Sequence, residues 1–352
     1  MEGQHPRVLF LPVSDATGIG EYMRSVIIAD EVKRLWPGAQ IHFLLSRDAP
    51  YGNACPYPAT LLQDSPTKAV AAVCNFMTDF KPDLVVFDAS GRRSQLAHAK
   101  RLGAAVIFIS QHARKRRRGM KLSRARLTDC HWVAQPEFAI PEVSAFSRFK
   151  LQLFGGATPV ATGPFFARVD AERQQALLMQ LGLTYGGFWL LNAGSGAHTL
   201  GDRAAMLQLV EAASQQFSET GIPALAVMGP AYKGEMPPRP GIQYQASLTN
   251  HDFINLLAAA RGAVLSGGDT LLQAIALKKP CVAVAVTKDQ PARIARCEAK
   301  GLVMSSGADE LVSKMAMLNA ECEALTLRLQ QSDCGNGLDW VEAELSALLE
   351  HK

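Results

Sequence analysis

Short aliphatic runs alternate with longer amphipathic stretches along the first half of the chain. The runs at 83–89 and 104–110 are nearly continuous in apolar residues, as is typical of parallel strands covered by helices on both faces. The alternation predicts a Rossmann-like α/β layer. The expected strands are 7–13, 40–46, 83–89, 104–110, 131–134 and 150–154, and the expected helices lie near 20–36, 66–79 and 94–102.

A second alternation begins after a Gly/Pro-rich stretch that follows Phe154. We therefore predict two Rossmann-like domains, 1–162 and 163–335, and a C-terminal helix in 336–352 that packs back on the first domain. Open parallel sheets bind ligands at the carboxyl ends of their strands, so the active site is expected in a cleft between the domains. The strands expected here are 188–194, 223–229, 242–246, 262–267 and 280–286, and the helices lie near 202–219, 252–260, 269–278, 291–300, 308–332 and 338–350.

The composition fits a cytoplasmic protein with two cores, since the chain has 352 residues and is 48% hydrophobic. The sequence has no uncharged apolar window of the roughly eighteen residues that a membrane-spanning helix needs, and its N-terminus lacks a signal-peptide pattern. Seven cysteines without a CxxC pair argue against a disulfide framework and against a structural zinc site.

The positive charge of the chain is concentrated in one segment. The net charge is +4, but eight basic residues lie between Arg114 and Arg126, and the rest of the chain has 28 basic and 32 acidic residues. Such a run is either a solvated flexible loop or a patch that attracts phosphates or an anionic lipid surface. Nucleic acid is the least favoured partner, because no aromatic residues are interleaved and no nucleic-acid-binding module is recognisable.

The stretch LSGGDTLLQ, in the second half, carries the sharpest chemical signal. A strand is expected to end at Ser266, and Gly267 and Gly268 are expected to leave backbone amides bare. Asp269 or Thr270 can cap the following helix. A helix N-terminus preceded by such a glycine turn is suited to bind a diphosphate.

Two further loops carry candidate ligand-binding groups. Asp289 and Gln290 follow the strand 280–286 and are placed to hydrogen-bond the hydroxyls of a sugar. In TGIGEYMR, Gly18 and Gly20 predict a tight turn that opens a helix. Met23 occupies the place of the third glycine of a dinucleotide fingerprint, which weakens a nicotinamide or flavin assignment.

The order of strand, SGG, helix, proline-led strand and DQ resembles the donor domain of glycosyltransferases of the GT-B fold. The pattern is nearest to the bacterial peptidoglycan GlcNAc-transferase branch and to the related nucleotide-sugar hydrolases of pseudaminic acid synthesis. TGPFFARVD is similar to the interdomain linker, LLNAGSGAH to the first loop of the donor domain, and TGIGEYMR to the first loop of the acceptor domain. The resemblance implies an α/β protein with two Rossmann-like domains facing across a cleft.

The resemblance also implies roles for individual residues. Such enzymes stabilise the departing diphosphate with backbone amides and helix dipoles, so neither a metal nor another cofactor is expected. The residues expected to bind the donor are Ser195, Gly196, Ser266, Gly267, Gly268, Thr270, Gln273, Asp289 and Gln290. Those expected on the acceptor side are Gly18, Gly20, Arg24, Asp88, Arg116 and Arg117.

Two departures from the family pattern bear on the chemistry. Gln273 stands where an acidic residue of the family usually hydrogen-bonds the ribose, so the resemblance does not determine which nucleotide binds. Glu21 replaces the histidine of a GxGHxxR pattern. Glu21 or Asp15 is therefore the expected base, because a carboxylate in a partly desolvated cleft can be tuned to accept a proton. The alternative is that Glu21 is a surface acid in the first turn of a helix, where the helix dipole favours it. The other candidate groups are Asp88, His112 and His198.

The sequence thus predicts a metal-independent glycosyltransferase of the hexosyltransferase type. It would move a sugar from a nucleotide-diphosphate sugar, with a UDP-sugar favoured, to an anionic or lipid-linked acceptor. The segment 114–126 would contact the inner face of the membrane peripherally. One alternative is a nucleotide-sugar hydrolase or epimerase on the same fold. The other is a non-catalytic binding or scaffold protein, which the replacements at Glu21 and Gln273 favour.

Overall fold

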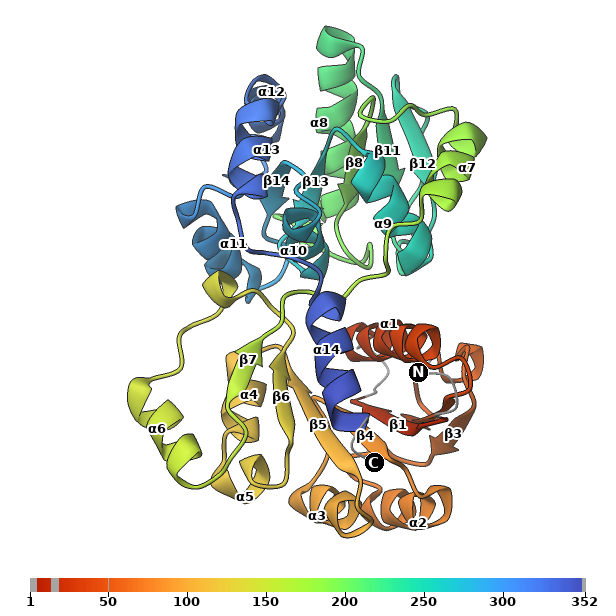
Figure 1. The fold of residues 1–352 in the computed structure, drawn as a ribbon. Helices are drawn as coiled ribbons and strands as arrows, with labels where there is room; N and C mark the ends of the chain where they lie inside the picture. The colour runs from red at the N-terminus through yellow and green to blue at the C-terminus, as the bar shows by residue number, and fades with distance from the viewer. Residues whose placement is uncertain (1–4, 14–18, 50, 350–352) are drawn as a thin grey trace. The chain divides into compact units, whose positions relative to one another are not determined.

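The structure is a computed structural model that describes residues 5–13, 19–49 and 51–349. The chain divides into two compact units. Unit 1 comprises Met1–Phe165 and Gly337–Lys352, and unit 2 comprises Phe166–Asn336 (Figure 1). The last segment of the chain therefore belongs to the same unit as the first.

Unit 1 is built on a seven-stranded sheet in the order β3-β2-β1-β4-β5-β6-β7, and all of its strand pairs are parallel. The strands are β1 (Arg7–Pro12), β2 (Gln40–Ser46), β3 (Ala59–Leu62), β4 (Leu84–Asp88), β5 (Ala105–Ser110), β6 (Cys130–Val133) and β7 (Pro159–Ala161). The helices are α1 (Gly20–Leu35), α2 (Val70–Phe80), α3 (Arg93–Arg101), α4 (Ala113–Gly119), α5 (Leu122–Ala125), α6 (Ala145–Leu153) and α14 (Gly337–Leu349).

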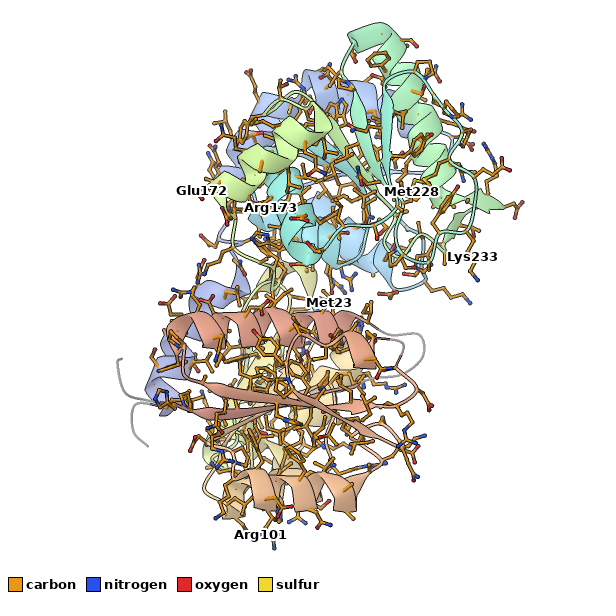
Figure 2. All side chains as sticks on the ribbon, turned by 90° about the vertical axis from the view of Figure 1, so that its right-hand side faces the viewer. Met23, Arg101, Glu172, Arg173, Met228 and Lys233 are labelled. Carbon is orange, nitrogen blue, oxygen red and sulfur yellow. The ribbon has the colours of Figure 1, made fainter. Side chains whose placement is uncertain are left out.

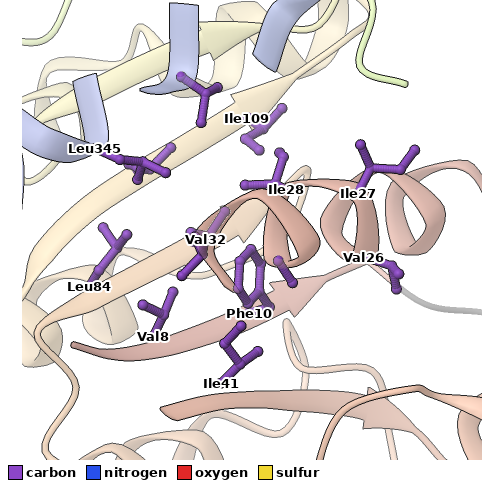
Figure 3. Close-up of a cluster of buried hydrophobic side chains, with 14 of the residues drawn as sticks. Val8, Phe10, Val26, Ile27, Ile28, Val32, Ile41, Leu84, Ile109 and Leu345 are labelled. Carbon is purple, nitrogen blue, oxygen red and sulfur yellow. The ribbon is translucent and has the colours of Figure 1, made fainter. Parts of the chain in front are cut away.

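The strands of unit 1 are apolar on both faces because helices cover both. Successive side chains of a strand point to opposite faces, so Val8 and Phe10 enter one core while Leu9 and Leu11 enter the other. The first core also takes residues of α1 and α14, among them Ile28 (Figure 3). The second core takes residues of α2 and α3. This double burial explains the continuous apolar runs in the sequence.

Helix α14 returns to unit 1 from the far end of the sequence. Its apolar face, Leu338, Val341, Leu345 and Leu349, is buried in the core that α1 and β1 share. Glu342 accepts a hydrogen bond from Arg34 Nη2 at 2.9 Å, and Glu344 accepts one from Cys130 Sγ at 2.9 Å. The helix thus closes one face of the sheet.

Unit 2 repeats the design with a six-stranded parallel sheet in the order β12-β11-β8-β13-β14-β15 and a short β9–β10 hairpin. Its strands are β8 (Trp189–Asn192), β9 (Thr199–Leu200), β10 (Arg203–Ala204), β11 (Ala224–Val227), β12 (Ile242–Gln245), β13 (Gly262–Ser266), β14 (Cys281–Val284) and β15 (Met304–Ser306). Its helices are α7 (Ala171–Leu181), α8 (Ala205–Thr220), α9 (Asn250–Ala259), α10 (Asp269–Ala276), α11 (Gln290–Ala299), α12 (Leu311–Ala320) and α13 (Cys322–Gln330). No helix among the described residues is long and apolar enough to cross a membrane.

Two sequence-based assignments are wrong, and one of two alternatives is excluded. The expected strand 150–154 belongs to α6, which Ser144 begins by accepting a hydrogen bond from Ser147 N at 3.3 Å. The edge strand is instead β7, in the Gly/Pro-rich stretch that follows Phe154, where a proline is tolerated as the first residue of an edge strand. The expected helix 308–332 is two helices, α12 and α13. Of the two alternatives for the basic run, the structure excludes the flexible loop, because most of the run lies in α4 and α5.

Candidate functional site

Two glycine turns of unit 2 pack backbone against backbone. The first, Gly194–Gly196, follows β8, and the second, at Gly229, follows β11. Gly196 has φ 88°, and a Cβ added to it would lie 2.3 Å from the carbonyl oxygen of Met228, which follows β11 (Figure 2). Ala231 N donates to Ser195 O at 2.8 Å. Asn192 orients the first turn, because its Oδ1 accepts from Gly194 N at 2.9 Å and its Nδ2 donates to Val227 O at 2.9 Å.

The first of these turns lies beside the end of β13. A Cβ on Gly194 would be 3.6 Å from Ser266 Oγ and 3.9 Å from the ring of His198. The structure therefore brings the predicted loop of Ser195 and Gly196 close to Ser266. These residues are about 70 positions apart in sequence, and they meet because β8 and β13 are neighbouring parallel strands that end at the same edge of the sheet.

The turn before α10 differs in detail from the expectation. Gly268 is the N-cap, so neither Asp269 nor Thr270 caps the helix, and both lie in its first turn. Gly267 N donates to Val284 O at 2.9 Å, so this amide is used within the sheet. The nearest atoms that a Cβ on Gly268 would meet are Ser266 Oγ at 3.8 Å and Gln290 Nε2 at 3.9 Å. Gly268 thus lies at an open position before a helix N-terminus.

The residues after β14 border the same turn. Gln290 is buried, and its Oε1 accepts from Val286 N at 2.8 Å. Asp289 is more than half exposed and accepts from Thr287 Oγ1 at 2.8 Å. Buried Arg293, which the sequence analysis missed, donates from Nη1 to Gly267 O at 2.5 Å and lies 3.5 Å from Asp289. The sequence could have pointed to Arg293 through its position four residues after Asp289, a spacing at which oppositely charged side chains pair on a helix. Gln273 is buried on α10.

Two predicted acceptor-side residues of unit 1 form a buried ion pair. Arg24 Nε donates to Asp88 Oδ2 at 2.8 Å and Nη2 donates to Oδ1 at 2.6 Å, with side-chain exposures of 5% and 0%. Arg24 also donates to Gln111 Oε1 at 3.3 Å. The Asp88 carboxylate is therefore fully enclosed at the carboxyl end of β4.

The predicted bases of unit 1 have different placements. Glu21 is partly exposed in the first turn of α1, and Gly20, also exposed, begins this helix. His112 is exposed and is the N-cap of α4, just after β5. Asp15 and Gly18 lie outside the described residues.

Three cations of the basic run converge on the turn after β4. Lys115 Nζ donates to Ala89 O at 3.0 Å, Arg124 Nη1 donates to Gly91 O at 2.9 Å, and Arg118 also donates to Gly91 O. Burial, followed by the neighbouring arginines, lowers the pKa of Lys115 and Arg118, and it lowers the pKa of Arg124 to about 10. Mutual repulsion among these cations means that an added anion would be stabilised here.

The two remaining acceptor-side arginines lie on α4. Arg116 is buried, donates to Pro141 O at 2.5 Å, and has an Nε without a hydrogen-bond partner among the described residues. It lines a cavity of about 340 Å³ together with Arg148, Glu137 and Glu142. Arg117 is exposed. Of the predicted site residues, Arg116 is the one that borders this cavity.

Solved glycosyltransferases share the fold of the whole chain. SnogD from Streptomyces nogalater is 16% identical, with a TM-score of 0.66, and the match covers 98% of this chain and 100% of that one. UGT2 of Phytolacca americana, complexed with UDP-2fluoro-glucose and pterostilbene, is 13% identical with a TM-score of 0.65, covering 99% and 100%. CalG4, the calicheamicin glycosyltransferase, is 15% identical with a TM-score of 0.63, covering 99% of each chain.

These likenesses show that the chain has the GT-B fold of glycosyltransferases, as the sequence predicted. At these identities they show the fold alone. No protein-family model matches the sequence, and no curated protein sequence matches it. Among the described residues, no group of three or more His, Cys, Asp or Glu side chains is arranged to hold a metal ion.

Proposed function

We propose that this protein is a glycosyltransferase that takes a sugar from a nucleotide-diphosphate sugar held by unit 2 and passes it to an acceptor held by unit 1. The observation that carries the proposal is the convergence of the Gly194–Gly196 turn, Ser266 and the start of α10 around the open position at Gly268. UGT2, which has the same fold, is complexed with UDP-2fluoro-glucose, and we favour a UDP-sugar for this chain.

The diphosphate would lie in front of Gly268. The first-turn N–H groups of a helix have no acceptor within the helix, and the helix dipole adds partial positive charge at this end. As the bond to the sugar breaks, negative charge grows on the departing diphosphate, and these fixed donors stabilise it. We propose that Ser195, Gly196 and Thr270 line the same position and that no metal is required. Activity that survives exhaustive chelation would support this part of the proposal, and loss restored by a divalent cation would contradict it.

The side chains after β14 would bind the donor sugar. Gln290 is held by Val286 N, so its amide nitrogen remains oriented toward Gly268. Asp289 presents an exposed carboxylate that can accept hydrogen bonds from hydroxyl groups. Gln273, on α10, is proposed to contact the ribose.

We propose Glu21 as the base that accepts the acceptor proton, with Asp15 and His112 as the other candidates. Glu21 is partly exposed and is one of the charges that act on Lys115. Removal of a general base lowers the rate by roughly 10²–10⁴-fold. Glu21→Gln should therefore lower kcat by such a factor and leave donor affinity unchanged. Equal turnover in Glu21→Gln and the natural protein would remove Glu21 from this role.

The acceptor is proposed to be anionic or lipid-linked. The convergence of Lys115, Arg118 and Arg124 on one backbone turn supports a phosphate-bearing acceptor near the ends of β4 and β5. Burial and then the repulsion between neighbouring cations lower the pKa of these groups, and the negative charge of an added phosphate would oppose both effects. We extend the proposal to peripheral membrane contact by residues 114–126. Acceptor affinity should then fall as salt concentration rises.

The decisive experiment is a calorimetric panel of UDP-, GDP-, dTDP- and CMP-sugars with the natural protein and two alanine variants. Gly268→Ala adds a methyl group at the proposed diphosphate position with ordinary contacts to the protein, so stability should be retained while donor affinity falls by tenfold or more. Gly307→Ala is the matched control, because a Cβ there meets no described atom within 4 Å. Absence of binding by every donor, or equal affinity in Gly268→Ala, would refute the proposed site.

Turnover assays separate the transferase from its alternatives. Release of free sugar without any acceptor would assign the protein to nucleotide-sugar hydrolases. Donor binding with neither transfer nor hydrolysis would indicate a non-catalytic binding protein.

A further inference from the structure

Helix α6 exposes several large apolar side chains, and contiguous exposed apolar patches mark interaction surfaces. Phe146 is 75% exposed, Phe149 60% and Leu153 63%, and the C-cap residue Phe154 is 48% exposed. Leu151 is the buried residue of the helix. The sequence analysis did not find this surface, because it assigned part of the segment to a strand.

The exposed residues share one side of α6, and that side faces away from the rest of unit 1. Positions three and four apart lie on the same helix face, which places Phe146, Phe149 and Leu153 together. Leu151 lies on the opposite side and packs near Ala125 of α5, since a Cβ on Gly156 would be 2.9 Å from Ala125 Cβ and 3.1 Å from Leu151 Cδ2. Ala157 N also donates to Ala125 O at 3.0 Å. The helix is thus attached through its inner side, beside α5 (Figure 1).

The positive charge of the segment that contains α6 indicates which partner the exposed apolar side of this helix would bind. The segment 113–153, which spans α4, α5 and α6, contains ten basic and three acidic residues, whereas the rest of the chain contains 26 basic and 29 acidic residues. Eight of the ten basic residues, all except Arg116 and Arg124, reach the solvent at least in part. Arg148 and Lys150, both exposed, lie on α6 itself. A second copy of the chain would bring two basic surfaces together, but an anionic lipid surface complements both the charge and the apolar side chains.

We propose that α6 inserts the surface formed by Phe146, Phe149, Leu153 and Phe154 into the headgroup region of an anionic bilayer. Amphipathic helices with aromatic and basic residues bind at this depth, and their affinity grows with buried apolar area and with attraction to anionic lipid. The inference rests on the peripheral membrane contact proposed for residues 114–126 and deepens it, because it assigns the inserted element to α6. It does not depend on sugar transfer, since it holds whether or not a donor binds unit 2.

The test measures binding of the full chain to vesicles by sedimentation. Vesicles of phosphatidylcholine mixed with phosphatidylglycerol should bind the protein, and vesicles of phosphatidylcholine alone should bind it much more weakly. Phe146→Ser/Phe149→Ser should weaken binding by about tenfold or more, since each phenylalanine loses the apolar burial of a full side chain. Its melting temperature should stay unchanged, because both side chains are exposed.

Met179→Ser is the matched control, since Met179 is 75% exposed on α7 of unit 2 and should not affect vesicle binding. A second measurement uses Phe149→Trp. Its added fluorescence should shift to the blue on anionic vesicles and should be quenched by lipids brominated on the acyl chain.

Three results would overturn the proposal. The natural protein could fail to bind anionic vesicles, the double serine variant could bind as well as the natural protein, or acyl-chain quenching could be absent. Concentration-dependent dimerisation that Phe149→Ser abolishes, without vesicle binding, would assign the same surface to self-association instead.

Discussion

The ion pair between Arg24 and Asp88 allows a direct test of whether these residues stabilise unit 1 or bind the acceptor. Both side chains are at least 95% buried, and two hydrogen bonds of 2.8 and 2.6 Å join them. Asp88→Leu would leave the guanidinium buried without its counter-ion, and Arg24→Met would leave the carboxylate in the same condition. The double variant Arg24→Met/Asp88→Leu removes both charges at once.

The expected magnitudes separate the two roles. Removing one partner of a buried pair costs about 3–5 kcal/mol, because the remaining charge is uncompensated, whereas replacing both by apolar residues is often nearly neutral. Two independent losses would add to about 6–10 kcal/mol, which is comparable to the whole stability of a domain. We therefore expect the double variant to be more stable than either single variant.

Hydrogen exchange measured peptide by peptide gives the free energy of opening for each unit separately. Amides of β1 and β4 should lose about two to four orders of magnitude of protection in each single variant, since 1.4 kcal/mol corresponds to a factor of ten. Protection in β8 and β13 of unit 2 should not change, which makes them an internal control. Additive losses in the double variant would refute this reasoning. Unchanged protection in the single variants, together with lost acceptor binding, would show that the pair serves the ligand.

Three further predictions concern packing and protonation. Burial, followed by the charges of Arg116 and Arg124, lowers the pKa of His131 from the ordinary 6.5 to about 3. Between pH 6.5 and pH 3 the unfolded chain therefore binds more protons than the folded protein. The free energy of unfolding should fall by up to about 1.4 kcal/mol per pH unit as the pH drops below 6.5. His131→Gln should flatten that slope in urea titrations at several pH values, and an unchanged slope would locate the effect elsewhere. Gly196→Ala should lower both stability and donor affinity more than Gly201→Ala. Both glycines have positive φ, but only a Cβ on Gly196 would lie 2.3 Å from the carbonyl oxygen of Met228. Equal melting temperatures of the two variants would contradict the close packing. Leu345→Ala should destabilise unit 1 by about 2–5 kcal/mol, whereas exposed Leu327→Ala should change the free energy of unfolding little; equal costs would show that α14 does not complete the core.

Most strands and helices could be predicted because their signals are local. The apolar runs at β4 and β5 and the helical periodicity at α9, α10 and α11 are complete within about ten residues, and the structure has elements at all of these places. The failures have a different origin. Strand β7 is three residues long and exists because its backbone pairs with β6, and periodicity does not record a pairing partner. The residues 150–154 satisfy an apolar strand pattern and a helix pattern equally, and the cap at Ser144 decides between them.

Some features of the candidate site could likewise be predicted from local sequence, whereas others depend on contacts between distant segments. The sequence by itself determined the fold class, the glycine turns after the strands and the concentration of basic residues, because each depends on residue types and short spacings. Only the tertiary structure decided that Gly267 N is used by the sheet, that Arg24 and Asp88, 64 positions apart, neutralise each other, and that the apolar side of α6 faces outward. These outcomes depend on which backbone groups and charges meet when distant segments pack, and such encounters are properties of the folded chain alone.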